Sequence, residues 1–314
     1  MSSFPPGYRV GHTSDLAGRT GCTVILPPAG TVAAVDVRGG APGTRETGVF
    51  TPGNLVSEIH GLVFAGGSAF GLAAADGVAT WLGRRGVGFA IGPARVPIVA
   101  AAVLFDLAVG DPNAHPDASM GEAACQTAVD GEIASGAIGA GTGATVGKLL
   151  GIGNAAAGGV GVASVALPGG DRVCALAAVN AFGDVIDAET DKVVAGAARA
   201  GRFIDAARAL ERDLLENSPI AGSSTTLACV ATTIPFDPAS LKRVAIEAHD
   251  GLARAVRPAH TVLDGDVVFA LAPGCPSAPP LLTRLRVGAA AARAVAAAIL
   301  DAVSTPESRS NVRA

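Results

Sequence analysis

One stretch of the chain combines hydroxyl side chains with the start of a strand, an arrangement that suits a nucleophile. Ser223-Ser224-Thr225-Thr226 is a turn of small residues that leads into the apolar, β-branched segment 227–232. This pattern predicts a buried strand. If the chain cuts itself between Ser224 and Thr225, Thr225 carries both an attacking hydroxyl and a free α-amine that serves as its base. The alternative is an ordinary core strand whose threonines are only β-formers.

Two acidic residues are expected to join this hydroxyl. Residues 238–257 have the spacing of an amphipathic helix that begins at Asp237-Pro238, and residues 267–272 follow as a buried strand. A strand–helix–strand unit predicts parallel neighbours whose starts lie side by side. Asp264 and Asp266 would then lie near Thr225, where they could orient the hydroxyl and amine. Otherwise they are turn formers on either side of Gly265.

A glycine-rich loop joins the short buried strand 62–65 to a helix expected at 72–82. Its sequence, Gly66-Gly67-Ser68-Ala69-Phe70-Gly71, matches neither the nucleophile elbow G-x-S-x-G nor the dinucleotide fingerprint G-x-G-x-x-G. We expect this loop to pack the helix closely against the sheet. Its backbone amides are candidates for facing a substrate.

A second glycine-rich loop, residues 134–148, resembles a phosphate-binding loop only superficially. A Walker loop requires glycine where Thr142 stands and Ser or Thr where Leu149 stands. Nucleotide binding is therefore not expected.

Lys148, at the end of the loop, is either a solvated cation or a site residue. Asn180 follows the strand expected at 173–179 and is either a turn residue or an oxyanion-hole donor.

Composition narrows the function classes. The chain has 314 residues, 49% apolar and 16% charged, which indicates a folded protein with a large core. The 42 glycines and 4% aromatic residues predict tightly packed α/β layers. A net charge of −4 argues against nucleic acid as the main partner. The apolar segment 287–303 is interrupted by Arg293 and Asp301, so no membrane span is expected.

The N-terminus, the cysteines and the histidines indicate the location of the protein and its use of cofactors. The N-terminus lacks the pattern of a signal peptide. The five cysteines are scattered without C-x-x-C spacing, which predicts reduced thiols in a cytoplasmic protein. The five histidines lack metal-binding spacing, so neither a metal nor an organic cofactor is expected.

The remaining elements are expected as follows. Strands are expected at 22–26, 31–37 and 98–106, a helix at 120–129, a hairpin at 158–167 and 173–179, and a final helix at 280–302. The loop 38–47, rich in glycine and charge, is either shaped for close approach or a tight surface turn. Residues 187–221 are polar and irregular, which predicts a loose, exposed connection that is partly helical over 197–214.

Several separated motifs, in order, resemble those of the L-aminopeptidase/D-esterase (DmpA-like) family of self-processing hydrolases, with the nylon-oligomer endohydrolase branch as the nearest. The resemblance covers roughly residues 7–300. The similar stretches are Arg38 to Thr47, Gly66 to Val78, Thr225 to Leu227, His249 to Ala255 and Asp264 to Leu271.

This resemblance implies an α+β fold, an αββα four-layer sandwich of the N-terminal-nucleophile hydrolase type. It implies a single domain over 1–314 that is cut into an α subunit, 1–224, and a β subunit, 225–314, with Thr225 as nucleophile. Asp264, Asp266, Lys148 and Asn180 match the branch's other catalytic residues. A homo-oligomer of cleaved units is expected by the same analogy.

Two positions depart from the family pattern. Ser224 stands before the scissile bond where relatives usually have Asn or Gly. Phe105 falls where nylon hydrolases carry a tyrosine, so a substrate-positioning hydroxyl is missing. Gly66, Gly67, Ser68 and Phe105 are the expected substrate-loop residues.

The sequence therefore predicts a self-cleaving amidohydrolase that acts on small peptides, amino-acid amides or their oligomers. Two rival functions stay open: an acyltransferase of the ornithine-acetyltransferase type, and a non-catalytic scaffold that does not mature.

Overall fold

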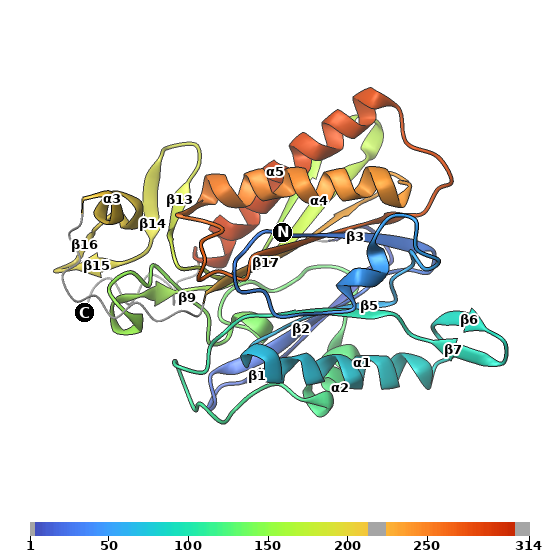
Figure 1. Cartoon of the computed structure of the whole chain (residues 1–314), viewed down its shortest axis with the longest axis horizontal. Helices are drawn as coiled ribbons and strands as arrows, with labels where there is room; N and C mark the ends of the chain where they lie inside the picture. The colour runs from blue at the N-terminus through green and yellow to red at the C-terminus, as the bar shows by residue number, and fades with distance from the viewer. Residues whose placement is uncertain (1–3, 213–223, 305–314) are drawn as a thin grey trace.

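The chain forms a four-layer sandwich in which two sheets face each other and helices cover both outer faces (Figure 1). The computed structural model describes residues 4–212 and 224–304. In Figure 1, helices α4 and α5 lie above the sheets and helices α1 and α2 below them. The predicted αββα architecture is confirmed.

The sheet that carries the site has the strand order β11-β12-β17-β19-β3. Strand β17 runs antiparallel to β12 and parallel to β19, and β19 is antiparallel to β3. The predicted parallel pairing across the 238–257 helix is therefore confirmed. The bounds are β11 Gly159–Ala166, β12 Arg172–Asn180, β17 Thr225–Thr232, β19 Val267–Pro273 and β3 Thr31–Val37.

The other five-stranded sheet has the order β1-β2-β5-β8-β4. Strands β2 and β3 are separated by one short turn, yet they belong to different sheets, so this turn carries the chain across the sandwich. The bounds are β1 Arg9–Asp15, β2 Thr20–Leu26, β5 Gly61–Ala65, β8 Val99–Val103 and β4 Thr44–Arg45.

Three apolar layers hold the sandwich together. The layer between the sheets includes Phe64 of β5 and Phe269 of β19, whose ring centroids are 6.2 Å apart. Helices α4 and α5 pack over one sheet, and α1 and α2 pack over the other. The helix bounds are α1 Ala74–Gly83, α2 Ala118–Thr127, α4 Pro238–Ala255 and α5 Leu281–Ala302.

Small residues let these layers approach closely, as the composition predicts. A Cβ on Gly251 of α4 would stand 1.9 Å from the carbonyl oxygen of Ala292 in α5, which is shorter than any real contact. A Cβ on Gly161 of β11 would stand 2.1 Å from the carbonyl oxygen of Ala298.

Helix α4 begins as predicted, because the Asp237 carboxylate accepts a hydrogen bond from Ser240 N.

The prediction for residues 187–221 was right in part where the structure describes them. A helix at 206–211 lies within the segment predicted to be partly helical, but the segment is not a loose, exposed connection. Residues 192–211 contain three short strands and a helix, and Ala195, Ala197 and Ala206 are buried. The strands were missed because each has only two to four residues. Residues 213–221 lie outside the described part of the chain. The bounds are β13 Asp184–Asp187, β14 Lys192–Ala195, β15 Ala198–Arg199, β16 Arg202–Phe203, α3 Ala206–Glu211 and β18 Val256–Arg257.

Short elements complete the described part of the chain. They are β6 Phe89–Ile91, β7 Ala94–Val96, β9 Thr145–Val146, β10 Ala156–Ala157, and the 3-10 turns Thr47–Phe50, Ser68–Ala73, Gly139–Gly141, Ile152–Asn154 and Pro168–Gly170. Within the described ranges, none of the helices combines the length and apolarity that a membrane crossing requires.

Candidate active site

Thr225 is the first residue of the central strand β17 and is almost fully buried, with 4% of its surface exposed. Its Oγ1 donates a hydrogen bond of 2.6 Å to the carbonyl oxygen of Ser224. The same carbonyl oxygen accepts a second hydrogen bond, 2.8 Å long, from Gly265 N. The peptide group before Thr225 is therefore fixed between a hydroxyl and a polarising N–H donor.

Asp266 lies beside the start of β17, and both oxygens of its carboxylate accept hydrogen bonds. Its Oδ1 accepts a hydrogen bond of 2.7 Å from Thr226 N, and its Oδ2 accepts hydrogen bonds from His260. Asp266 therefore holds the backbone immediately after Thr225.

Asp264 lies on the other side of Gly265 and is held by separate donors. Phe182 N donates to its Oδ1 at 3.2 Å, and Thr261 donates to its Oδ2 through N and Oγ1 at 3.1 and 2.6 Å. Burial raises the pKa of Asp264, and the nearby charge of Asp266 raises it further. Among the described residues, neither carboxylate is hydrogen-bonded to Thr225 Oγ1 in the intact chain.

Lys148 is buried in the site and is not the solvated cation that was the alternative. Only 3% of its surface is exposed. Its Nζ donates to Asn180 O at 2.7 Å and to Asn180 Oδ1 at 2.9 Å, and it lies 3.4 Å from Ser224 Oγ. Burial lowers the pKa of Lys148 from 10.5 to about 7, although Asp264, Asp106 and Asp266 favour its charged form. Near neutral pH the amine can therefore both accept and donate a proton.

Asn180 ends β12 directly opposite Thr225 in the antiparallel register. Its Oδ1 accepts hydrogen bonds from Lys148 and from Thr145 N, and its Nδ2 donates to Phe105 O at 2.9 Å. In this arrangement the amide positions Lys148 and ties the two sheets together. Its predicted role as an oxyanion donor stays a prediction.

A pocket of about 210 Å³ opens at Thr225. Two of the four predicted substrate-loop residues, Ser68 and Phe105, line it. Part of the 38–47 loop also lines it, which supports close approach as the purpose of that loop. The lining residues are mostly small: Ala41, Pro42, Gly43, Ser68, Ala69, Val103, Leu104, Phe105, Thr225 and Leu263.

Gly66 and Gly67 lie behind this pocket and do not line it. Gly67 N donates to Asp106 Oδ1 at 2.7 Å, and a Cβ on Gly66 would stand 2.0 Å from Asp106 Oδ2. Ser68 N donates to Leu104 O, which holds Ser68 at the rim. The two glycines therefore let the loop pack on the buried Asp106 while Ser68 reaches the pocket.

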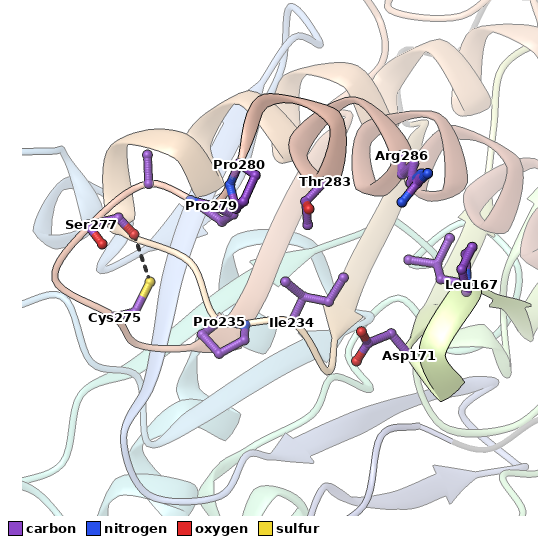
Figure 2. A pocket seen from close by; sticks show the side chains of 12 residues that line it. Leu167, Asp171, Ile234, Pro235, Cys275, Ser277, Pro279, Pro280, Thr283 and Arg286 are labelled. Atoms are coloured by element: carbon purple, nitrogen blue, oxygen red, sulfur yellow. Dashed lines mark hydrogen bonds between the residues drawn. The ribbon is translucent and has the colours of Figure 1, made fainter.

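A larger pocket of about 470 Å³, shown in Figure 2, lies at the end of strands β17 and β19 that is opposite to Thr225. Ile234 and Pro235, which follow β17, line it together with Cys275, which follows β19. Thr225 is separated from this pocket by the full length of β17. The smaller pocket is therefore the candidate active site, because it holds the Thr225 hydroxyl next to the titratable groups.

Gly265 has room for no side chain. A Cβ at this position would stand 2.8 Å from Thr225 Oγ1 and 2.7 Å from Ala41 O. We expect Gly265→Ala to displace the hydroxyl or the 38–47 loop and to lower amide hydrolysis by about 100-fold, the loss typical of a misplacement near 1 Å. Steady-state kinetics measures this loss. Gly153→Ala, where nothing lies within 4 Å of the added Cβ, is the matched control.

Sequence reasoning missed three residues that hold the site. Gly265 supplies the donor to Ser224 O, Thr261 holds Asp264, and His260 holds Asp266. The available signal was their place in the 258–266 turn, which also carries the acidic pair. A lone histidine or threonine in a turn does not identify its partner.

Solved structures with the same architecture define the class of fold. An L-aminopeptidase D-Ala-esterase/amidase from Ochrobactrum anthropi, described as a variant of the Ntn hydrolase fold, superposes with a TM-score of 0.71. The match has 19% identity over 96% of this chain and 86% of that one. A β-aminopeptidase from Burkholderia sp. gives a TM-score of 0.69 at 24% identity, over 95% and 84%. The chain thus has an N-terminal-nucleophile hydrolase fold.

The chain belongs to peptidase family S58, whose family model matches residues 6–313. It is 46% identical to an uncharacterized aminopeptidase of Mycobacterium tuberculosis (strain ATCC 25618 / H37Rv), over 95% of this chain and 91% of the relative. It is 32% identical to a 6-aminohexanoate-oligomer endohydrolase of Kocuria sp. (strain KY2), over 95% and 83%. The predicted family is confirmed, and the chain is a hydrolase of peptide or amide bonds.

Proposed function

We propose that this chain is a self-cleaving amidohydrolase in which Thr225 becomes the N-terminal nucleophile. The observation that carries the proposal is the contact between Thr225 Oγ1 and the carbonyl group of Ser224, at 2.6 Å, beside a lysine whose pKa is about 7. A hydroxyl in contact with the preceding carbonyl group needs little movement to attack it.

Self-cleavage begins when Thr225 Oγ1 bonds to the carbonyl carbon of Ser224. The neutral amine of Lys148 takes up the hydroxyl proton and passes it to the Thr225 nitrogen as the C–N bond breaks. Gly265 N–H, already hydrogen-bonded to Ser224 O, stabilises the negative charge that develops on that oxygen. Water then hydrolyses the resulting ester, which frees the Ser224 carboxylate and restores the Thr225 hydroxyl.

The mature site uses the new α-amine as its base. Thr225 Oγ1 attacks the amide carbonyl of the substrate, the α-amine accepts the proton, and the leaving amine receives it. Water releases the acyl group by the same route in reverse. Asp264 and Asp266 lie at the start of β17, where they can stabilise the α-amine in its protonated form.

The substrate class is an amide with a small acyl part. The pocket at Thr225 has a volume of about 210 Å³, and Ala41, Gly43, Ser68 and Ala69 narrow it. Small peptides, amino-acid amides and short amino-acid oligomers fit this description. The names of the relatives, an aminopeptidase and an endohydrolase of 6-aminohexanoate oligomers, fall within the same class.

Intact-mass spectrometry of the purified protein tests the maturation step. We expect two fragments, residues 1–224 and 225–314, with Thr225 as a new N-terminus. The free α-amine mechanism is wrong if an uncut chain hydrolyses amides.

For assembly and location, we propose a homo-oligomer of cleaved units in the cytoplasm. The exposed Leu281, Leu282 and Leu285 on α5 support an interface, which sedimentation velocity tests.

A further inference from the structure

Two histidines behind Asp266 take no part in the chemistry described above. His260 donates to Asp266 Oδ2 twice, from its ring Nδ1 at 2.8 Å and from its backbone N at 2.9 Å. The third donor to the carboxylate, Thr226 N, bonds to the other oxygen. Asp266 is buried, with 1% of its side chain exposed, so these three donors set the direction of its carboxylate.

The backbone of His260 is in an unusual conformation. Its φ is 55°, in the left-handed region, which costs a non-glycine residue free energy but is tolerated best by Asn, Asp and His. This conformation brings the backbone N–H and the ring N–H of one residue to the same carboxylate oxygen. A local strain that aims two donors at one site residue indicates a functional constraint.

The second histidine fixes the ring of the first. His249 of α4 is fully buried, and its ring lies edge-on to that of His260, with centroids 4.8 Å apart and planes at 71°. Its Nε2 is 3.0 Å from the carbonyl oxygen of Asp36, so Nε2 carries the hydrogen. Burial lowers the pKa of His249 to about 4, which keeps this ring neutral near pH 7. Lys242 and Arg38 in turn hold the Asp36 carboxylate.

We propose that His260 is a positioning residue for the reaction, which holds the Asp266 carboxylate with Oδ1 toward the start of β17 and thereby fixes Thr225 and its α-amine. His249 holds the His260 ring in place. This inference rests on the proposed function of Thr225. It assigns to His260 an effect on turnover and not on substrate binding, because His260 is not among the described residues that line the pocket at Thr225.

Two variants of the full-length chain separate the donor from the bulk of the ring. His260→Ala removes the ring donor. His260→Asn keeps a side-chain N–H near the position of Nδ1 and tolerates the left-handed backbone. Kinetics with L-alanine p-nitroanilide as the probe, normalised to the mature fraction from mass spectrometry, measures kcat and KM. We expect His260→Ala to lower kcat by 10- to 100-fold, as loss of a supporting hydrogen bond does elsewhere, with KM unchanged within about twofold. His260→Asn should restore most of kcat.

The inference is overturned if His260→Ala has the kcat of the wild type. It is also overturned if His260→Asn melts at the wild-type temperature but has the low kcat of His260→Ala. If His260→Ala does not fold, His260→Asn decides alone, since a near-wild-type kcat supports the donor role and a low kcat in a stable protein contradicts it. Thr225→Ala separates the two proposals. An active Thr225→Ala variant removes the proposed function, whereas an inactive one beside a fully active His260→Ala removes only this inference.

Discussion

Thr225→Ala is expected to leave the chain uncut and to abolish amide hydrolysis. The variant lacks the hydroxyl that contacts the Ser224 carbonyl, and without the cut it also lacks the free α-amine. Losing nucleophile and base together should lower kcat by at least 1,000-fold, in the range seen when a catalytic nucleophile is removed. Intact mass and initial rates measure both effects.

The neighbouring residue provides a matched control. Thr226 is fully buried on the same strand, and within the described ranges its hydroxyl has no hydrogen-bond partner. Thr226→Val should therefore process and turn over normally, with an equal or higher melting temperature, because an unpaired buried hydroxyl is costly. Thr225→Ser, which keeps a hydroxyl, should still be cut. Normal processing of Thr225→Ala would show that another residue is the nucleophile.

Lys148→Met is expected to block processing and to change how stability depends on pH. The variant fills the same space but removes the amine that contacts Asn180 and Ser224, so we expect cleavage to slow by at least 100-fold. Mass spectrometry of the variant over time measures that rate.

The sign of the pH effect follows from the lowered pKa. Burial holds the pKa of Lys148 at about 7 in the folded chain, against 10.5 when exposed, so the unfolded state binds more protons between these values. Stability contributed by this group is complete above pH 10.5 and is lost as the pH falls towards 7. Between pH 7 and 9 the free energy of unfolding should rise by about 2 kcal/mol more in the uncut Thr225→Ala chain than in Thr225→Ala/Lys148→Met.

Denaturant melts of both proteins at several pH values measure this difference. Lys192→Met in the same uncut background, which removes an exposed lysine, is the control for the loss of one positive charge. A difference between Thr225→Ala and Thr225→Ala/Lys148→Met that does not vary with pH would contradict the lowered pKa. Processing of Lys148→Met at the wild-type rate would contradict the role of the Lys148 amine in self-cleavage.

The sequence was most informative where one helix joins two strands. The spacing of residues 238–257 and the capping pair Asp237-Pro238 predicted α4. The parallel pairing expected of two strands joined by a helix then placed Asp264 and Asp266 beside the start of β17. Each step of this reasoning concerns consecutive elements of the chain, which is why the sequence could predict it.

Contacts between distant segments could not be predicted in the same way. The opposition of Asn180 to Thr225 depends on the register between β12 and β17, which side-chain packing in the assembled sandwich selects. The burial of Lys148 depends on that register, since its partners are Asn180 and Ser224. From the sequence, the position of Lys148 at the end of a glycine-rich loop left a solvated cation as the alternative.

The position of β17 has a consequence for the life of the protein. In the sheet, β17 and β19 lie between β12 on one side and β3 on the other. A cut before Thr225 therefore leaves two strands of the shorter fragment clamped between strands of the longer one, and hydrogen bonds along both edges hold the fragments together. Such a protein can assemble from one chain only once. Once cut and unfolded, the protein must refold from two separate fragments, so the yield of refolded protein should depend on the protein concentration. The lifetime of the folded state should then be set by the rate of unfolding.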